Sequence, residues 1–440
     1  MNARFLPSGP AAGAELLVLA PCLPRPDGDA ASLRWYQLLR FLGRHFRVHL
    51  GCSADPLRDG AQFSRVRALC HETCFVAPPG IGRSMRLAAM RLGALRMAPA
   101  LQAWATRLCA RRPVGAVLAC GAGMGACLAA LPPGLVRVVD FVELESDRQR
   151  RRGAVRPWPG AALWRRQARR LLAIERGAGA ACDAALFAGA ADVARFRLFA
   201  PESAHKAQLL ASGVDPEHYS PHILQRSPYR PGERVLLLAG PLQGDAADAA
   251  RWLAAEVFAP LRAADPTLSL YLADTSAHAC RRPSLGALAR QDGVTLVGGQ
   301  GAPFDPRPYL AHAALVLAPP ADGHAAGMAV LAAMAMQKSV LGLPRSLSGL
   351  ACLQLPEALA AADAPGFRAR IAAVLAEIGD GAGNGAENGA GNGAGTRAGQ
   401  ASAVGRAARA RVLREHDWNL RLAGLPALMA GAVQPLASAG

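Results

Sequence analysis

The feature that most constrains this chain is a series of short, uninterrupted apolar runs that alternate with segments of helical periodicity. The runs lack the in–out alternation of a half-exposed strand, so we expect strands covered by helices on both faces. Strand–helix alternation of this kind predicts doubly wound parallel sheets. The runs are 15–23, 47–54, 73–79, 115–121, 136–143, 184–190 and 207–215, followed by 234–240, 268–274, 294–299, 314–320 and 339–344.

The runs form two sets, separated by a stretch rich in proline and polar residues. We therefore predict an α/β protein with two Rossmann-like domains that face a cleft, followed by C-terminal helices. A glycine-, alanine- and asparagine-rich stretch near the end cannot bury enough apolar surface to order itself. The predicted divisions are an N-terminal Rossmann-like domain (1–215), a linker (216–233), a C-terminal Rossmann-like domain (234–378), a low-complexity flexible insert (379–400), and terminal helices and tail (401–440).

The chain is strongly basic, with a formal net charge of +17, and Lys206 and Lys338 are its only lysines. Such arginine bias indicates GC-rich coding DNA, so part of the charge carries no functional information. The remainder is consistent with a polyanionic partner, which is an anionic lipid, a phosphate-bearing substrate or nucleic acid. The 10 cysteines include no CxxC pair, and we expect reduced core cysteines and no metal site.

Two apolar segments are candidates for a secretory signal and for a membrane-spanning helix. The first apolar run has no basic segment directly before it, so we expect no secretory signal and a cytoplasmic protein. Residues 113–136 carry no charge and are long enough to span a bilayer. Pro132 and Pro133 would break a helix there, so we expect a strand, a glycine turn and a short helix instead.

Because ligands of open α/β sheets bind beyond the carboxyl ends of the strands, the loops after the apolar runs hold the candidate site. Gly28 and Asp29 form a tight turn before a helix, where free N–H groups favour an anion, although an Asp-capped turn fits equally. Asp140, Glu143 and Glu145 follow or end the fifth run. A carboxylate there could take a proton from an acceptor hydroxyl, or these acids could only offset neighbouring arginines.

Two further glycine loops lie in the second half. Gly240 lets the backbone approach a ligand closely. Asp322, Gly323 and His324 begin a helix, where a diphosphate would be favoured, while a lone histidine is more often a structural donor. The loop 120–126 in the first half matches the dinucleotide fingerprint, but the helix behind it is too short for a crossover. An NAD-dependent enzyme therefore stays open as a less favoured interpretation of the chain.

A basic amphipathic segment follows the acidic stretch. Trp158 and Trp164 lie near its start, and its arginines recur at helical spacing. Such a helix is typical of a membrane surface, and it lacks the interleaved aromatics that nucleic acid binding would need. A solvated basic face is an equally good explanation. The arginines of the predicted membrane or acceptor patch are Arg165, Arg166, Arg169 and Arg170.

In their order, these pieces resemble GT-B glycosyltransferases of family 4, and most closely the sugar transferases of exopolysaccharide and exosortase (PEP-CTERM) systems. The resemblance runs from about residue 15 to 377 and again over 403–430, through stretches such as VVDFVELESD, SGVDPEHYSP and LAAMAMQKSVLG. It implies transfer of a sugar from a nucleotide-diphosphate sugar to a lipid-linked or polysaccharide acceptor, with retention of configuration. It implies no metal and no resident cofactor, because the nucleotide-sugar is a substrate. The expected partners include an anionic membrane surface at the inner face of the plasma membrane, and no nucleic acid.

The resemblance also places residues. Asp140 and Glu143 match an acidic stretch that we assign to catalysis, and Gly28, Asp29 and Gly240 match donor-side glycine loops. Ala332 stands where the family has a glutamate that holds the donor ribose. Losing such a charge-assisted hydrogen bond costs about 1.5–3 kcal/mol.

Either another group replaces the lost glutamate, with Asp322, His324 and Lys338 as candidates, or the chain is a non-catalytic paralogue that serves as a binding subunit.

Overall fold

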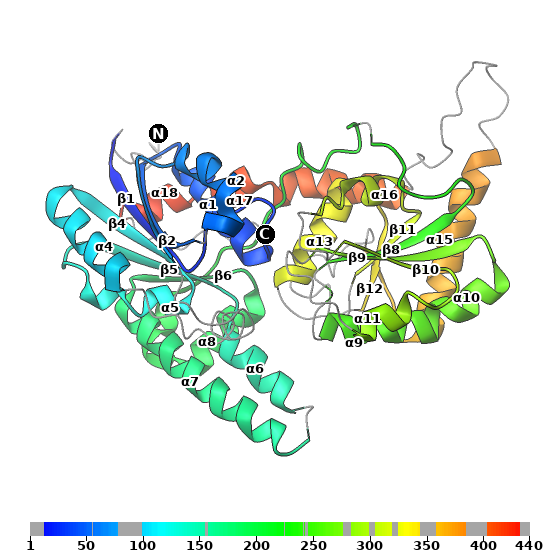
Figure 1. Cartoon of the computed structure of the whole chain (residues 1–440), viewed down its shortest axis with the longest axis horizontal. Helices are drawn as coiled ribbons and strands as arrows, with labels where there is room; N and C mark the ends of the chain where they lie inside the picture. The colour runs from blue at the N-terminus through cyan, green and yellow to red at the C-terminus, as the bar shows by residue number, and fades with distance from the viewer. Residues whose placement is uncertain are drawn as a thin grey trace, which may run out of the picture. The chain divides into compact units, whose positions relative to one another are not determined.

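The chain forms two compact units in the computed structural model (Figure 1). The first unit comprises the described residues within Met1–Pro26, Ala31–Ala211 and Arg421–Gly440, and the second those within Asp27–Ala30 and Ser212–Leu420. The described residues from Arg421 to Gly431 thus belong to the same unit as the first strand. The structure describes residues 13–54, 56–77, 99–154, 157–223, 225–240, 242, 245–275, 283–298, 304–318, 324–343, 358–383 and 403–431.

The first unit is built on a seven-stranded sheet in the order β3-β2-β1-β4-β5-β6-β7. All neighbouring strands are parallel, as the uninterrupted apolar runs predict. The strand order changes direction at β1 and β4, which is the usual position of a ligand site in such sheets. The strands are β1 (Glu15–Ala20), β2 (Arg47–Ser53), β3 (Glu72–Val76), β4 (Val114–Cys120), β5 (Val136–Val142), β6 (Ala184–Phe187) and β7 (Ala207–Leu209).

The second unit has a six-stranded sheet in the order β10-β9-β8-β11-β12-β13, which is also parallel throughout. The order again changes direction beside its first strand. The prediction of two Rossmann-like parallel sheets is therefore confirmed. The strands are β8 (Arg234–Gly240), β9 (Leu268–Asp274), β10 (Val294–Gly298), β11 (Leu315–Leu317), β12 (Val340–Gly342) and β13 (Ala358–Ala360).

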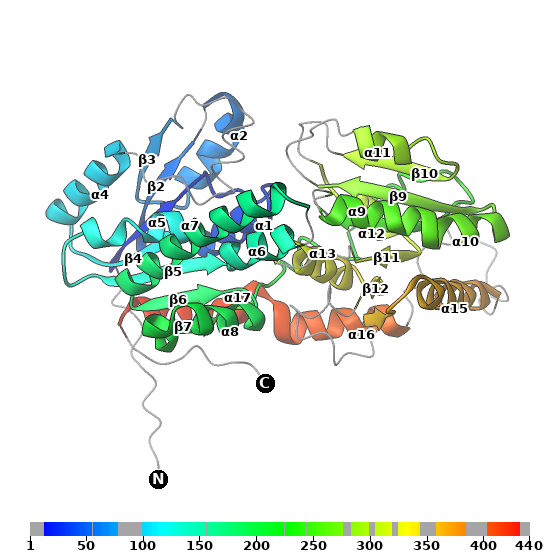
Figure 2. The same ribbon diagram turned by 90° about the horizontal axis from the view of Figure 1, so that it is seen from below.

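Helices connect the strands in both units (Figures 1 and 2). Those of the first unit are α1 (Ala30–Leu42), α2 (Pro56–Arg67), α4 (Pro99–Arg111), α5 (Ala122–Gly125), α6 (Glu145–Ala154), α7 (Gly160–Ala181), α8 (Ala190–Phe199) and α18 (Leu425–Met429). Those of the second are α9 (Asp245–Trp252), a π-helical turn η3 (Leu253–Phe258), α10 (Ala259–Ala264), α11 (Pro283–Leu288), α12 (Arg307–His312), α13 (His324–Ala335), α15 (Ala364–Gly383), α16 (Ala403–Arg411) and a π-helical turn η5 (Val412–His416). Helix α17 (Trp418–Leu422) includes the boundary between the two units.

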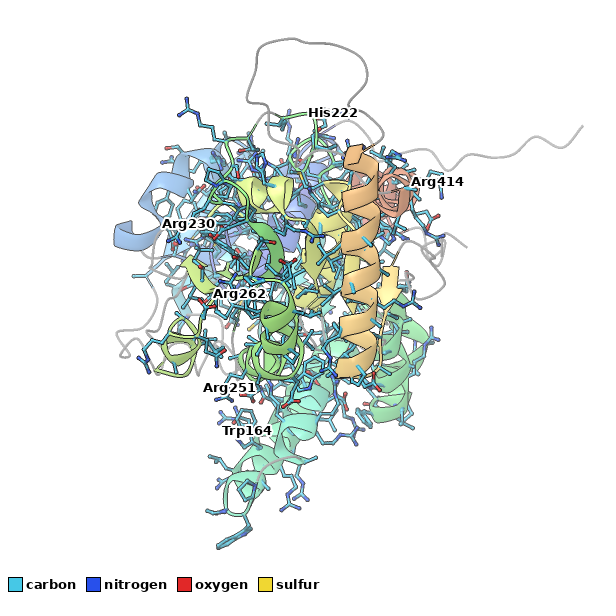
Figure 3. All side chains as sticks on the ribbon, turned by 90° about the vertical axis from the view of Figure 1, so that its right-hand side faces the viewer. Trp164, His222, Arg230, Arg251, Arg262 and Arg414 are labelled. Carbon is cyan, nitrogen blue, oxygen red and sulfur yellow. The ribbon has the colours of Figure 1, made fainter. Side chains whose placement is uncertain are left out.

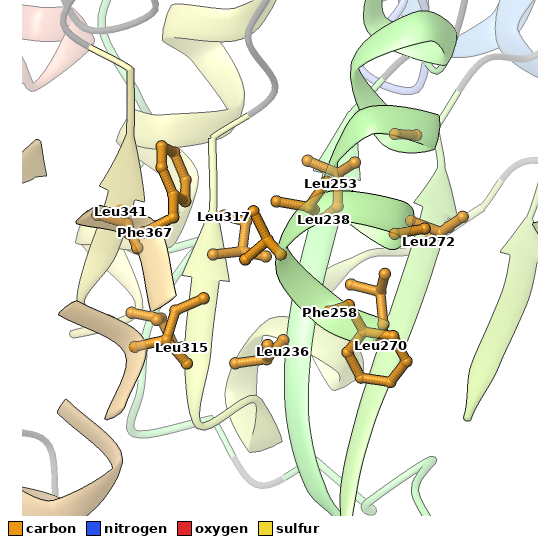
Figure 4. Packing of buried hydrophobic residues seen from close by; sticks show 14 of the residues in the cluster. Leu236, Leu238, Leu253, Phe258, Leu270, Leu272, Leu315, Leu317, Leu341 and Phe367 are labelled. Carbon is orange, nitrogen blue, oxygen red and sulfur yellow. The ribbon is translucent and has the colours of Figure 1, made fainter. Parts of the chain in front are cut away.

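Both faces of the second sheet are buried. On one face, Leu236 and Leu238 of β8 pack with Phe258 of η3 and Phe367 of α15 (Figure 4). On the other face, Leu237 belongs to a separate cluster with residues of α13, α16 and η5. Alternate residues of one strand thus enter different cores, which is why the run carries no polar positions.

The uncharged segment 113–136 does not form one helix. It folds as β4, the four-residue helix α5 and a 3₁₀ turn at Leu128–Ala130. Gly121, with φ +84°, makes the turn between strand and helix. Across the described part of the chain, no helix is long and apolar enough to cross a membrane.

Two details differ from the sequence reading. β13 was not anticipated, because its alanine-rich sequence is typical of a helix. Helix α15 continues to Gly383 and so includes the first residues of the predicted insert. The insert beyond residue 383 lies outside the described residues.

Helix α13 approaches α16 closely at one glycine. A Cβ on Gly405 of α16 would lie 2.1 Å from the carbonyl oxygen of Gln337, which follows α13. Gln337 itself has a left-handed backbone, with φ +59°. The last turn of α13 is therefore held against α16 by a contact that only glycine permits.

We expect Gly405→Ala to destabilise the second unit by about 1–3 kcal/mol, because backbone must move to admit the methyl group. Gly177→Ala is the matched control, since Gly177 is helical in α7 and a Cβ there meets nothing within 4 Å. The control should be neutral or stabilising by up to about 1 kcal/mol. Thermal unfolding of both variants measures this, and equal behaviour of the two would contradict the close approach.

Candidate functional site

A buried ion pair lies near the carboxyl end of β5. Arg34 of α1 and Asp140 of β5 both have side chains of zero exposure. Arg34 Nη2 and Nε donate to the carboxylate at 2.8 and 2.9 Å, and Trp35 Nε1 donates to it at 3.1 Å. Arg34 Nη1 donates to the carbonyl oxygen of Leu210, just after β7, at 2.8 Å. The pair thus connects α1 with β5 and with the end of the sheet's last strand.

These contacts bear on the catalytic role predicted for Asp140. A general base needs a lone pair that can reach the substrate hydroxyl. Both carboxylate oxygens of Asp140 already accept hydrogen bonds from Arg34 and Trp35, and the residue is fully buried. The geometry therefore favours a positioning role for Asp140 over direct proton transfer.

Glu143 and Glu145 lie where the chain leaves β5. Arg148 lies between them, with Nη1 on the carboxylate of Glu143 and Nη2 on that of Glu145. Val142, which precedes them, has φ +68°, a conformation that is rare for a β-branched residue and indicates local strain. Glu143 retains a side-chain exposure of 21%. Glu145 retains 19% and also lies beyond the strand, so both of these acids are accessible, whereas Asp140 is not.

Two carboxyl groups beneath this turn have raised pKa values. Burial raises the pKa of Glu175, on α7, to about 7, and its carboxylate accepts a hydrogen bond from the Ser146 amide at 3.1 Å. Burial also raises the pKa of Glu145 to about 7, and the nearby Glu143 carboxylate adds to that effect while Arg148 opposes it. The junction between β5, α6 and α7 therefore changes its charge near neutral pH.

The turn that holds Gly28 and Asp29 comes directly before α1. Ser32, in the first turn of α1, accepts a hydrogen bond from the Arg25 amide at 3.0 Å and donates to the Leu23 carbonyl oxygen at 3.2 Å. The chain on either side of the turn is thus tied together. Asp29 is exposed, and the anion site predicted at this turn stays a prediction.

Three neighbouring strands of the second unit end at one level. Gly240, Asp274 and Gly298 are the last residues of β8, β9 and β10, and they are paired in register. The Leu242 amide donates to Asp274 Oδ1 at 3.1 Å, and the Thr275 amide donates to the Gly240 carbonyl oxygen at 3.0 Å. A Cβ on Gly298, whose φ is +78°, would lie 2.4 Å from the Asp274 carbonyl oxygen. At this carboxyl edge, Gly298 permits a close backbone contact, and hydrogen bonds of the Leu242 and Thr275 amides connect β8 with β9 beside the buried Asp274 carboxylate.

Helix α13 follows β11 and carries the motif in which glutamate is replaced. Ala332 is only 7% exposed and packs in a cluster with other residues of α13 and with Ala408 and Val412. A methyl group is all that this position offers. Asp322 and Gly323 lie outside the described residues, as does the side chain of His324, whose backbone begins the helix.

Lys338 is not placed to replace the lost glutamate. It precedes β12, and its Nζ donates to the carbonyl oxygen of Ala313, which precedes β11, at 3.1 Å. Both residues lie at the amino ends of their strands, opposite the edge formed by Gly240. Burial lowers the pKa of Lys338 to about 8, so this side chain is a buried structural donor.

The four patch arginines of α7 are all exposed. Arg165 Nε donates to the carbonyl oxygen of Ala161 at 3.3 Å, one turn earlier in the same helix. None of the four forms an ion pair with any residue that the structure describes.

Among the described residues, no group of three or more histidine, cysteine, aspartate or glutamate residues is placed to hold a metal ion. The described cysteines are free thiols. Burial raises the pKa of Cys70 and of Cys182 to about 12, so neither is a reactive thiolate near neutral pH.

Comparison with solved structures places the fold among glycosyltransferases. Sucrose-phosphate synthase from Thermosynechococcus elongatus is similar over 94% of this chain and 98% of its own, with a TM-score of 0.64 and 16% identity. WaaG, a glycosyltransferase involved in lipopolysaccharide biosynthesis, covers 94% of this chain and 100% of its own, with a TM-score of 0.60 and 14% identity. HepE from Anabaena, in complex with UDP and glucose, covers 93% of this chain and 97% of its own, with a TM-score of 0.57 and 13% identity.

No protein-family model and no curated protein matches the chain. At these identities the similarity establishes the GT-B fold, with its two Rossmann-like parallel-sheet domains.

Some residues of the site were not anticipated. Asp274 is the last residue of a predicted strand, so its place at a carboxyl edge was readable from the sequence. The contact between Arg34 and Asp140 was not readable, because 106 positions separate the two residues and no local pattern links them. The burial of Glu175 was not readable either, because the arginine-rich sequence around it is typical of an exposed helix.

We expect Arg34→Met or Asp140→Leu alone to destabilise the first unit by about 3–5 kcal/mol, because each leaves one buried charge without its partner. The double variant should be more stable than either single variant. Urea unfolding of the four proteins measures this coupling. Arg176→Gln is the control, because Arg176 forms an exposed pair with Glu202 and its loss should cost about 1 kcal/mol or less. Additive losses from the two single changes would contradict the pairing.

We expect local stability around α6 and α7 to fall as pH rises from about 4.5 to about 7. Glu145 and Glu175 bind a proton more tightly in the folded protein than in the unfolded chain, so ionisation opposes folding. Glu175→Gln should remove part of this slope and stabilise the region near pH 8 by up to about 3 kcal/mol. Hydrogen exchange of β5 and α6 measures it. Glu202→Gln, on an exposed carboxyl, should keep the slope, and an unchanged slope in Glu175→Gln would contradict the assignment.

Proposed function

We propose that this protein is a glycosyltransferase that moves a sugar from a nucleotide-diphosphate sugar to a lipid-linked or polysaccharide acceptor in cell-envelope or exopolysaccharide synthesis. The observation that carries the proposal is the carboxyl edge of the second sheet. There Gly240, Asp274 and Gly298 end neighbouring strands in register, Gly298 permits a close backbone approach to Asp274, and α13 follows the neighbouring strand β11. Backbone amides beyond such an edge and at a helix start suit the phosphates of a donor.

The similar solved structures support this assignment by their ligands and their fold. HepE was solved with UDP and glucose, and WaaG is a glycosyltransferase of lipopolysaccharide biosynthesis. The resemblance to family 4 implies retention of the sugar's anomeric configuration, without a required metal or resident cofactor. We place the protein at the cytoplasmic face of the plasma membrane as a peripheral protein.

The chemistry needs few groups. The bond between the anomeric carbon and the phosphate oxygen breaks, and the nucleoside diphosphate departs with the electron pair. The acceptor hydroxyl oxygen bonds to the anomeric carbon, and its proton passes to the departing phosphate oxygen. In our proposal the second unit stabilises the departing phosphate through backbone amides around Gly240 and at the start of α13. On the first unit, we propose that Glu143 binds an acceptor molecule, and that Arg34 with Asp140 holds the elements on which Glu143 depends.

The missing carboxylate at Ala332 shapes this proposal. A donor without its ribose anchor loses roughly tenfold to over a hundredfold in affinity. We propose that Asp274 and the unassigned loop at Asp322, Gly323 and His324 supply polar contacts in its place. A non-catalytic binding subunit is the alternative, and it predicts that no donor is hydrolysed.

The dinucleotide interpretation has weak structural support. The glycine loop after β4 leads into α5, which has four residues. The dipole of a helix is the sum of its aligned peptide dipoles, so a helix of four residues has almost no dipole to hold a pyrophosphate. The second sheet is the better place for a nucleotide.

We expect saturation-transfer NMR and thermal shift to show binding of UDP or GDP but not of NAD. Gly240→Val should weaken that binding by at least about tenfold, because a branched side chain blocks the close approach of backbone and phosphate. Gly286→Ala is the control, since a Cβ at Gly286 meets nothing within 4 Å. Release of free sugar from UDP- or GDP-sugars would then support an active transferase. Binding of NAD alone, or equal binding by Gly240→Val, would contradict the assignment.

A further inference from the structure

The helices α6 and α7 form a hairpin that reaches beyond the rest of the first unit (Figures 1 and 3). They pack along each other, and a Cβ on Gly153 of α6 would lie 2.8 Å from the Cβ of Trp164 on α7. Figure 3 shows Trp164 on this hairpin. The close approach at Gly153 joins the two helices near their far end, so they present one surface.

Two large apolar side chains are exposed near the turn of the hairpin. Trp158, before α7, is 80% exposed, and Leu163, in its first turn, is 66% exposed. Apolar side chains are unfavourable in water, and transfer of each one into an apolar phase is favourable by about 1.5–3 kcal/mol. Tryptophan in particular prefers the interface between lipid headgroups and acyl chains.

Positive charge follows directly behind this apolar tip. Arg165, Arg166, Arg169 and Arg170 are exposed on the next two turns of α7 and have no carboxylate partner among the described residues. At the root of the hairpin, by contrast, the acids are already balanced. Asp147 is buried against Arg150, Arg151 and Arg195. The distal half of the hairpin therefore presents arginine charge that nothing in the described protein neutralises.

We propose that this tip inserts Trp158 and Leu163 into an anionic lipid bilayer while the α7 arginines bind the headgroups. The order of apolar tip and cationic collar matches the layering of a bilayer surface, with acyl chains below phosphates. A nucleic acid would use the arginines but not a protruding apolar tip. The insertion would bring the first unit to the membrane that holds a lipid-linked acceptor. In that respect the inference rests on the proposed function, although membrane binding itself does not require catalysis.

Sedimentation of the full chain with phosphatidylglycerol-rich vesicles tests the charge requirement. We expect binding that is strong to these vesicles and weak to neutral phosphatidylcholine vesicles. The triple variant Arg166→Gln, Arg169→Gln, Arg170→Gln should bind about a hundredfold more weakly. The control triple Arg65→Gln, Arg67→Gln, Arg290→Gln removes the same charge from exposed positions elsewhere. If both triples weaken binding equally, or if vesicle composition has no effect, the proposal fails.

Quenching of tryptophan fluorescence by brominated lipids tests insertion. We expect vesicle-bound protein to be quenched, and Trp158→Phe to remove most of that quenching. Trp418→Phe is the control, because Trp418 is buried. Replacing both Trp158 and Leu163 by serine should weaken vesicle binding at least about tenfold, whereas Leu198→Ser, at an exposed leucine on α8, should not. Unquenched Trp158, or tighter binding of the chain to a DNA oligonucleotide than to anionic vesicles at physiological salt, would overturn the proposal.

These measurements need no nucleotide-sugar. A chain that binds and inserts into vesicles but hydrolyses no donor would leave the hairpin assignment standing and defeat the transferase. A chain that hydrolyses the donor but does not bind vesicles would support the transferase and contradict the hairpin assignment.

Discussion

The first unit depends on a single guanidinium. Arg34 is fully buried, and its guanidinium donates hydrogen bonds to the Asp140 carboxylate and to the carbonyl oxygen of Leu210. A buried cation is tolerated only when its charge and its donors are matched, because the desolvation penalty is several kcal/mol. These hydrogen bonds connect helix α1 with strand β5 and with Leu210, which follows β7. The carboxyl edge from which Glu143 emerges is therefore fixed by elements far apart in sequence.

The second unit fixes its own edge differently. At β9 and β10 it has a close backbone contact that glycine alone permits, at Gly298. Its helix α13 is apolar all round and held at its end by Gly405. We propose that backbone amides at this edge hold the donor, because amide dipoles are not removed by a side-chain change such as alanine at position 332.

Much of the fold was readable because the relevant signals are local. The run 234–240 coincides with β8, and 268–274 with β9, since fully buried strands leave uninterrupted apolar stretches. β13 escaped because alanine has no strand preference and tertiary pairing decided its conformation. The site was less readable. The acids after β5 could be named, but the full burial of Asp140 and the raised pKa of Glu145 depend on packing, which only the folded chain reveals.

The central claim is that a nucleoside diphosphate rests on the carboxyl edge of the second sheet. A crystal structure of the protein grown with UDP or GDP tests it most directly. We predict that the diphosphate lies within hydrogen-bonding distance of backbone amides at the end of β8 and at the start of α13. A nucleotide bound at the glycine loop after β4, or none at saturating concentration, would contradict the account.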